Sequence, residues 1–208
     1  MTDFDALIDA ERNRLIGALE RLDDERWNSP SLCGGWRVRD VVVHLLMPYQ
    51  MSLPRFFINM AAAGFAFDRM ADRWATRDTR PKDELLSALR RTKAERFGVP
   101  GAGPEAPLSH LVIHAEDIYR PLKIDHVIEP ESANIVLDQL TTPQAQRSLK
   151  PGLIDGLAFS TQDTGWRHGT GAQVLGSASA LISTLAGRQG SAAELTGEGA
   201  ILLQGRGR

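Results

Sequence analysis

The chain has 208 residues, a formal net charge of −2 at pH 7 and 42% hydrophobic residues. Such values are ordinary for a globular protein, and the length predicts one main domain with a smaller appendage. The nearly balanced charge provides no broad basic field for nucleic acid or for an acidic membrane surface.

Targeting signals and disulfides are not indicated by the sequence. No apolar run reaches the roughly 20 residues that span a bilayer, and the opening MTDFDALIDAERNR lacks the basic start and apolar stretch of a signal peptide. The single cysteine, Cys33, cannot form an internal disulfide, which agrees with a reducing compartment. We therefore expect a cytoplasmic protein.

The first half of the chain reads as helices separated by proline and glycine. Apolar residues recur at helical spacing over residues 2–22, and after a Gly/Pro-containing loop a nearly unbroken apolar run covers 38–51. Pro48 and Pro54 predict that this second, buried helix kinks or divides before 56–65.

Two further helices complete a predicted bundle. One is expected at about 81–97, and another runs from Pro107 to Pro121. Helices of this number and spacing predict an up-and-down four-helix bundle over residues 1–128.

The character of the sequence changes toward the C-terminus. We expect one linking helix over 129–150 and a small α+β subdomain over 151–208, so that the whole chain is α-rich and α+β in class. Within the subdomain, glycine-rich runs predict short strands, SASALISTLAG predicts a helix, and the last run, AILLQGR, reads as a strand.

The histidines give the main indication of chemistry. His110 and His114 are four residues apart, so on a helix their side chains lie one turn apart on one face. Together with Asp117 they oppose the apolar stripe of the same helix. A solvated polar face is the plain alternative, because an HxxxH pair alone is weak evidence of a metal site.

His44 strengthens the metal interpretation because it interrupts an aliphatic run at a position where the helix should be buried. It is either a core histidine hydrogen-bonded to a carbonyl or the third ligand of a cation that His110 and His114 also bind. Three imidazoles suit Zn²⁺ first, and Ni²⁺, Co²⁺ or Fe²⁺ as well. Asp117, one turn beyond His114, would then orient an imidazole.

Two segments carry a family resemblance: WNSPSLCGGWRVRDVVVHL at 27–45 and SHLVIHAEDIYRPL at 109–122. Together with GWRHGTG, VLGSASAL and LTGEG near the C-terminus, they make the chain resemble the actinobacterial mycothiol-dependent maleylpyruvate isomerase family, within the DinB/YfiT-like metalloenzymes. The resemblance implies a DinB-like four-helix bundle with a catalytic divalent metal on His44, His110 and His114. The second ligand is a glutamate in the isomerase branch and a histidine here, as in the three-histidine DinB-like branch.

The resemblance also implies mycothiol as co-substrate. A metal-bound thiolate would add to a small electrophilic molecule, which makes the chain a transferase or isomerase. Metal-hydroxide hydrolysis, with Glu116 or Asp117 as general base, is the alternative enzyme, and a non-enzymatic metal- or ligand-binding protein is the alternative to both. Cys33 could be a fourth ligand that closes the site or a reactive thiol, whereas its position beside Gly34 and Gly35 favours packing as a small apolar residue. By family analogy, Arg188 or Arg120 would meet an anionic substrate.

Overall fold

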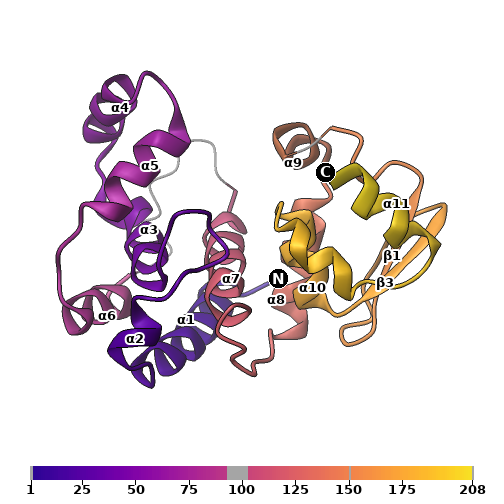
Figure 1. Ribbon diagram of the computed structural model, residues 1–208, viewed down its shortest axis with the longest axis horizontal. Helices are drawn as coiled ribbons and strands as arrows, with labels where there is room; N and C mark the ends of the chain where they lie inside the picture. Colours follow the sequence, from indigo (N-terminus) through magenta and orange to yellow (C-terminus); the bar gives the residue numbers. More distant parts are fainter. Residues whose placement is uncertain (1, 93–102, 150, 208) are drawn as a thin grey trace. The chain divides into compact units, whose positions relative to one another are not determined.

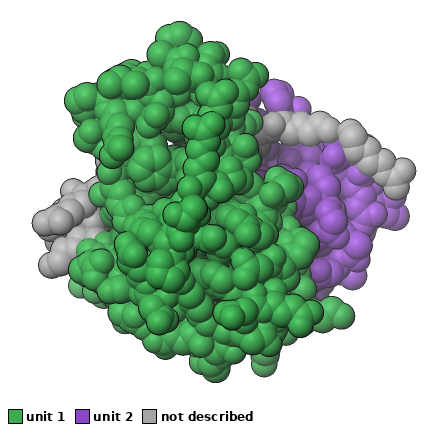
Figure 2. All heavy atoms as spheres, turned by 60° about the vertical axis from the view of Figure 1, so that its left-hand side comes forward, with its two compact units in different colours: residues 1–125 green, residues 126–208 purple. Residues whose placement is uncertain are grey.

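The computed structural model describes residues 2–92, 103–149 and 151–207. The chain divides into two compact units, residues 1–125 (unit 1) and 126–208 (unit 2), which are coloured separately in Figure 2. Each unit is described by itself. No helix in the described ranges is long and apolar enough to cross a membrane.

Unit 1 is helical throughout its regular structure (Figure 1). Its elements are α1 (Phe4–Glu20), α2 (Asp24–Trp27), α3 (Val38–Gln50), α4 (Leu53–Ala62), α5 (Phe67–Thr76), α6 (Lys82–Arg90) and α7 (Ala106–Tyr119).

The predicted bundle is formed by α1, α3, α6 and α7. Both α1 and α3 pack against α6 and against α7. Aliphatic side chains fill the space between these helices. Each of them, when fully buried, contributes about 1.5–3 kcal/mol to the stability of the fold. The largest of those with less than 2% exposure are Ile8, Leu15, Leu19, Leu45, Leu46, Leu85, Leu89, Leu108 and Ile118.

The predicted break after the second helix is confirmed. Helix α3 includes Pro48 and ends at Gln50, and α4 begins at Leu53 with Pro54 in its first turn, where a missing N–H is harmless. No residue of α4 is buried, although α5 packs against α3 and has Met70 in a small methionine-rich core.

The third predicted helix is present as α6, which Pro81 precedes as N-cap. Its predicted last residues, 93–97, and most of the following loop lie outside the described residues. The fourth helix, α7, begins at Ala106 and ends at Tyr119, shortly before Pro121, as the prolines predict.

Unit 2 combines helices with a small sheet in the order β2-β1-β3, in which β1 pairs antiparallel with β2 and parallel with β3. Helix α8 packs against α10, and α11 packs against β3. The elements are α8 (Pro130–Leu140), α9 (Pro143–Leu149), β1 (Leu157–Thr161), β2 (Arg167–Gly169), β3 (Ala172–Gly176), α10 (Ala178–Leu185), η2 (Gln189–Glu194) and α11 (Glu198–Gly207).

Two details of unit 2 differ from the sequence-based expectation. The segment 129–150 holds two helices rather than one, because Thr141 and Thr142 bond back to α8 carbonyls and Pro143 cannot continue the helix. The prediction of a strand in the last run is wrong. AILLQGR belongs to α11, which buries Ala200 and Leu203 three residues apart. An apolar run this short fits either a strand or a helix, and packing on β3 selects the helix.

Candidate metal centre

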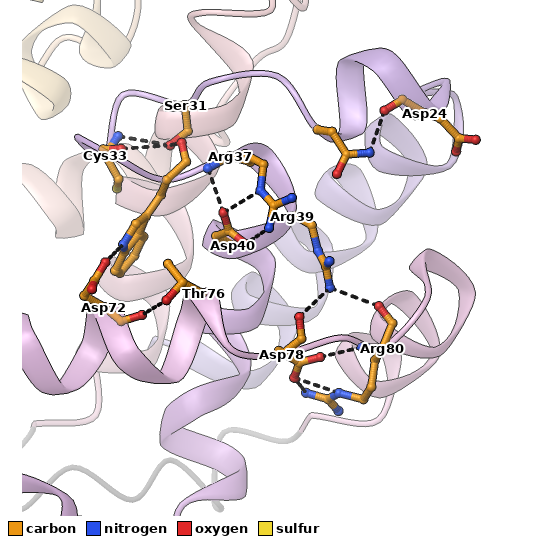
Figure 3. A network of polar contacts seen from close by, with 12 residues as sticks. Asp24, Ser31, Cys33, Arg37, Arg39, Asp40, Asp72, Thr76, Asp78 and Arg80 are labelled. Carbon is orange, nitrogen blue, oxygen red and sulfur yellow. Dashed lines mark hydrogen bonds and ion pairs between the residues drawn. The ribbon is translucent and has the colours of Figure 1, made fainter.

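His44 is positioned by a helix whose start is fixed by hydrogen bonds. The Asp40 carboxylate accepts from the Arg37 backbone N–H at 3.0 Å and from Arg37 Nε at 2.9 Å, which satisfies a donor at the first turn of α3. Both residues are labelled in Figure 3. In this helix Val41–Met47 are all buried, and His44 is only 6% exposed. A polar ring is thereby held in the bundle interior.

Helix α7 brings His110 and His114 to the same point. The Nε2 atoms of His44 and His110 are 3.3 Å apart, and the ring centroids of His44 and His114 are 4.6 Å apart. One ring nitrogen from each of the three histidines lies within 4.8 Å of the others. Helices α3 and α7 thus bring together the three histidine side chains that the sequence singled out.

The protonation state of His110 suits cation binding. Burial lowers the pKa of His110 well below 6.5, and the neighbouring His114 and His44 lower it further. Neutral imidazole is the form that binds a metal. Ligands at about 2.0–2.1 Å from a tetrahedral Zn²⁺ are about 3.3–3.4 Å from one another, which matches the 3.3 Å between His44 and His110. The donor set therefore fits a divalent cation.

Asp117 contacts the outer side of this cluster. Its Oδ2 lies 2.8 Å from Nδ1 of His114, so Nδ1 carries the proton toward the carboxylate and Nε2 is left as the acceptor nitrogen. Cys33 Sγ donates to the same Oδ2 at 3.0 Å and lies 3.9 Å from His114 Nδ1. Asp117 is fully buried, and these two donors offset part of the cost of its desolvation.

The loop before α3 places Cys33 there. The Leu32 N–H donates to the Asp117 carbonyl at 3.0 Å, and the Cys33 N–H donates to Ser31 Oγ at 3.1 Å. Gly35 adopts φ +81°, a left-handed conformation that favours glycine, and allows the tight turn before Trp36. Figure 3 shows Ser31 and Cys33 in this loop, beside the start of α3.

Trp36 covers His44, a contact that the sequence did not predict. The two ring centroids are 4.9 Å apart, and Trp36 Nε1 donates to Asp72 Oδ1 of α5 at 3.1 Å. For Cys33 the sequence left open a ligand or a packing residue. Both residues precede α3, so helical spacing carries no signal for either contact.

The other predicted residues lie elsewhere. Glu116 is buried and lies 3.8 Å from the guanidinium of Arg120 on the same helix. At about 100° per residue, Glu116 projects roughly 160° away from His114. Arg188 is in unit 2, where it follows Gly187 and donates to the Ala186 carbonyl.

A helical bundle with a histidine cluster between two of its helices defines the class of this protein, and comparisons with known proteins place it in a family. A family profile described as the mycothiol maleylpyruvate isomerase N-terminal domain matches residues 8–118. The chain belongs to this family, and its fold is consistent with the wider DinB-like superfamily.

Two solved structures have a similar fold. They are crystal structures of the mycothiol-dependent maleylpyruvate isomerase and of a histidine-to-alanine mutant of it. Each matches with a TM-score of 0.54 and 16% sequence identity, over 96% of this chain and 97% of the other. No curated protein matches the sequence significantly.

Proposed function

We propose that this chain is a metal-dependent enzyme that uses mycothiol, or a closely related small thiol, in the transfer or isomerisation of a small electrophilic molecule. His44, His110 and His114 would hold one divalent cation, with zinc as the first candidate. The observation that carries this proposal is the convergence of three ring nitrogens within 4.8 Å from two separate helices. Membership of the mycothiol maleylpyruvate isomerase family supports the choice of thiol.

A divalent cation at this position would lower the pKa of a thiol and so supply a nucleophile at neutral pH. The residues of the chain prepare the site for it. Asp117 fixes the tautomer and ring orientation of His114, and Trp36 shields one side of His44. Because all three proposed ligands are imidazoles, which bind a metal in the neutral form, none of them would offset the charge that stabilises a thiolate.

Two features favour the thiol over hydrolysis. Glu116 is directed away from the histidines and lies beside Arg120, and Asp117 already accepts hydrogen bonds from His114 and Cys33. A general base for water must be within hydrogen-bond reach of it. Neither carboxylate is placed for this task. A thiol starts from a pKa of about 8.5, far below that of bulk water, so coordination ionises it more readily and its proton can leave to solvent without a neighbouring base.

The position of Cys33 favours an open coordination site. Its sulfur lies by Nδ1 of His114, where it donates to Asp117. This is the outer side of a ring whose other nitrogen would be the ligand. A structural zinc site usually has four protein ligands, whereas a catalytic one keeps three and leaves a position for substrate.

The proposal is tested by calorimetric titration of mycothiol into zinc-loaded protein, beside protein stripped of metal. We expect saturable binding to the loaded protein, none to the stripped protein, and at least about tenfold weaker binding of S-methyl mycothiol, which cannot form a thiolate. Equal affinity for the thiol and its S-methyl derivative would contradict the proposal. Loss of thiol in the presence of a panel of small electrophiles then reports transfer, and conversion of an electrophile with the thiol conserved reports isomerisation. His168→Ala serves as the matched control, since His168 stacks on Trp166 in unit 2.

A further inference from the structure

A second candidate binding site lies between α4 and α5 of unit 1. A cavity of about 360 Å³ is lined by residues of these two helices and of the segment that follows α5. This volume is at the lower end of the range typical of sites for small organic ligands. Two pairs of its polar residues are spaced by one helical turn and therefore share a helix face. They are Arg55 and Asn59 on α4, and Arg73 and Arg77 on α5 and its C-cap.

The cavity is rich in hydrogen-bond donors. Three arginines line it, and the guanidinium groups of Arg55 and Arg77 have no hydrogen bond or ion pair within the described residues. Arg73 uses one nitrogen to donate to the Ala62 carbonyl at 2.8 Å. This bond ties α5 to the end of α4 and leaves the other donors of a planar fork available.

Trp74 adds a buried donor at the same place. Its Nε1 is inaccessible to solvent and has no hydrogen-bond partner among the residues described, and the residue is one of those that line the cavity. An unsatisfied buried N–H costs about 1–3 kcal/mol. A ligand would recover that free energy by displacing the atoms that cover Nε1 and bringing an acceptor to it.

One acidic residue, Asp78, also lines the cavity, but its charge is already compensated. Its carboxylate accepts from Arg80 through the backbone N–H at 2.8 Å and through Nε at 2.9 Å and Nη2 at 2.6 Å. The pair is drawn in Figure 3. The three lining arginines therefore leave an excess of positive charge.

We propose that this cavity binds a small organic oxyanion, carrying phosphate or carboxylate groups, between the guanidinium groups of Arg55 and Arg77. Arginine recognises both groups through paired N–H···O bonds. Trp74 would supply one more hydrogen bond and, with Met70, an apolar wall. The proposal rests on α4 and α5 alone and does not depend on the metal at the histidine cluster.

Calorimetric titration of the full chain with inorganic phosphate and, separately, with succinate tests this site at low ionic strength. We expect at least one of the two anions to bind saturably with one equivalent per chain. Binding of phosphate alone would assign the site to a phosphate group, and binding of succinate alone to a carboxylate pair. Absence of saturable binding by both anions would overturn the proposal.

Variants locate the binding. Arg55→Gln combined with Arg77→Gln should weaken it at least about tenfold, and Trp74→Phe about threefold or more. Both arginines are exposed, so circular dichroism should report an unchanged fold. Arg91→Gln, which alters an exposed arginine bonded to Ser87 on α6, is the matched control and should stay within about twofold. A loss as large in Arg91→Gln as in the double variant would show general charge attraction and overturn the proposal.

The same titration on His44→Ala protein separates this site from the histidine cluster. We expect unchanged anion affinity, because His44 does not line the cavity. Anion binding that disappears with His44 would overturn the assignment to α4 and α5.

Discussion

Asp117 and His114 lie one turn apart on α7 and are joined by a hydrogen bond of 2.8 Å between Oδ2 and Nδ1. The carboxylate is fully buried and receives a second hydrogen bond from Cys33. A carboxylate on the outer nitrogen fixes which nitrogen of the imidazole faces inward and makes that nitrogen a better ligand. The arrangement thus links a loop, a carboxylate and the proposed metal ligand.

Asp117→Asn should weaken metal binding. Removing the negative charge while retaining the shape of the side chain should lower zinc affinity about 10–100-fold, with the fold retained. Competition with a chromogenic chelator measures the affinity. Asp138→Asn is the matched control, because Asp138 also accepts from a ring N–H, that of Trp166, in unit 2. Equal zinc affinity in the Asp117 variant and wild type would contradict the orienting role.

Cys33→Ala separates an outer hydrogen-bond donor from a fourth ligand. We expect one equivalent of metal to remain bound, with affinity lowered by less than about tenfold, because only the donor to Asp117 is lost. Cobalt substitution offers a second measurement, since a thiolate ligand adds an intense sulfur-to-metal absorption band. Such a band in the wild type and its absence in Cys33→Ala would show that Cys33 is a ligand.

Trp36→Phe should destabilise unit 1 modestly while keeping a ring over His44. The lost bond from Nε1 to Asp72 should lower the free energy of unfolding by about 0.5–1 kcal/mol. A double-mutant cycle with Asp72→Ala, measured by urea denaturation, isolates this bond. Additive effects of the two substitutions would mean that the hydrogen bond contributes nothing.

Asp78→Asn should alter the pH dependence of stability. Burial opposes ionisation of Asp78, but hydrogen bonds from Arg80 and the charges of Arg80 and Arg39 outweigh it, so its pKa is lowered below 3.8. A lowered pKa in the folded state stabilises the protein above the unfolded value of about 3.9, and this contribution is lost as the pH falls through the folded pKa.

At neutral pH the Asp78 variant should therefore be about 1 kcal/mol less stable than wild type, and the gap should narrow as the pH falls below about 3.9. Urea denaturation across this range provides the measurement. Arg80→Gln removes the same pair from the other side and should show the same trend. A gap that is constant or grows on acidification would exclude the pair as its source.

The bundle could be predicted from the sequence because its determinants are local. Apolar spacing marks α1 and α7, and Pro48, Pro54 and Pro121 mark where helices end or divide. The histidine cluster was suggested by two local facts, the spacing of His110 and His114 and the aliphatic context of His44, and by the family resemblance. In unit 2 the short apolar run at 200–206 was compatible with a strand or a helix. Its packing against β3 favours the helix, α11.

The surroundings of the histidines could not be predicted in the same way. Cys33 and Trp36 reach His114 and His44 from an irregular loop, whose path depends on contacts such as that of Leu32 with the Asp117 carbonyl. The hydrogen bond from Cys33 to Asp117 joins residues 84 positions apart. The cavity between α4 and α5 likewise depends on how the two helices pack against each other. The spacing of residues within either helix does not determine that packing.

The measurement that tests the central claim most directly is the metal content of the purified full chain, determined by elemental analysis after zinc loading and dialysis. We predict one equivalent of metal per chain in the wild type and in His168→Ala, and at most about a tenth of that in His44→Ala and His110→Ala. Circular dichroism should show that both variants stay folded. A full equivalent of zinc in folded His44→Ala and His110→Ala protein would contradict the proposed metal centre.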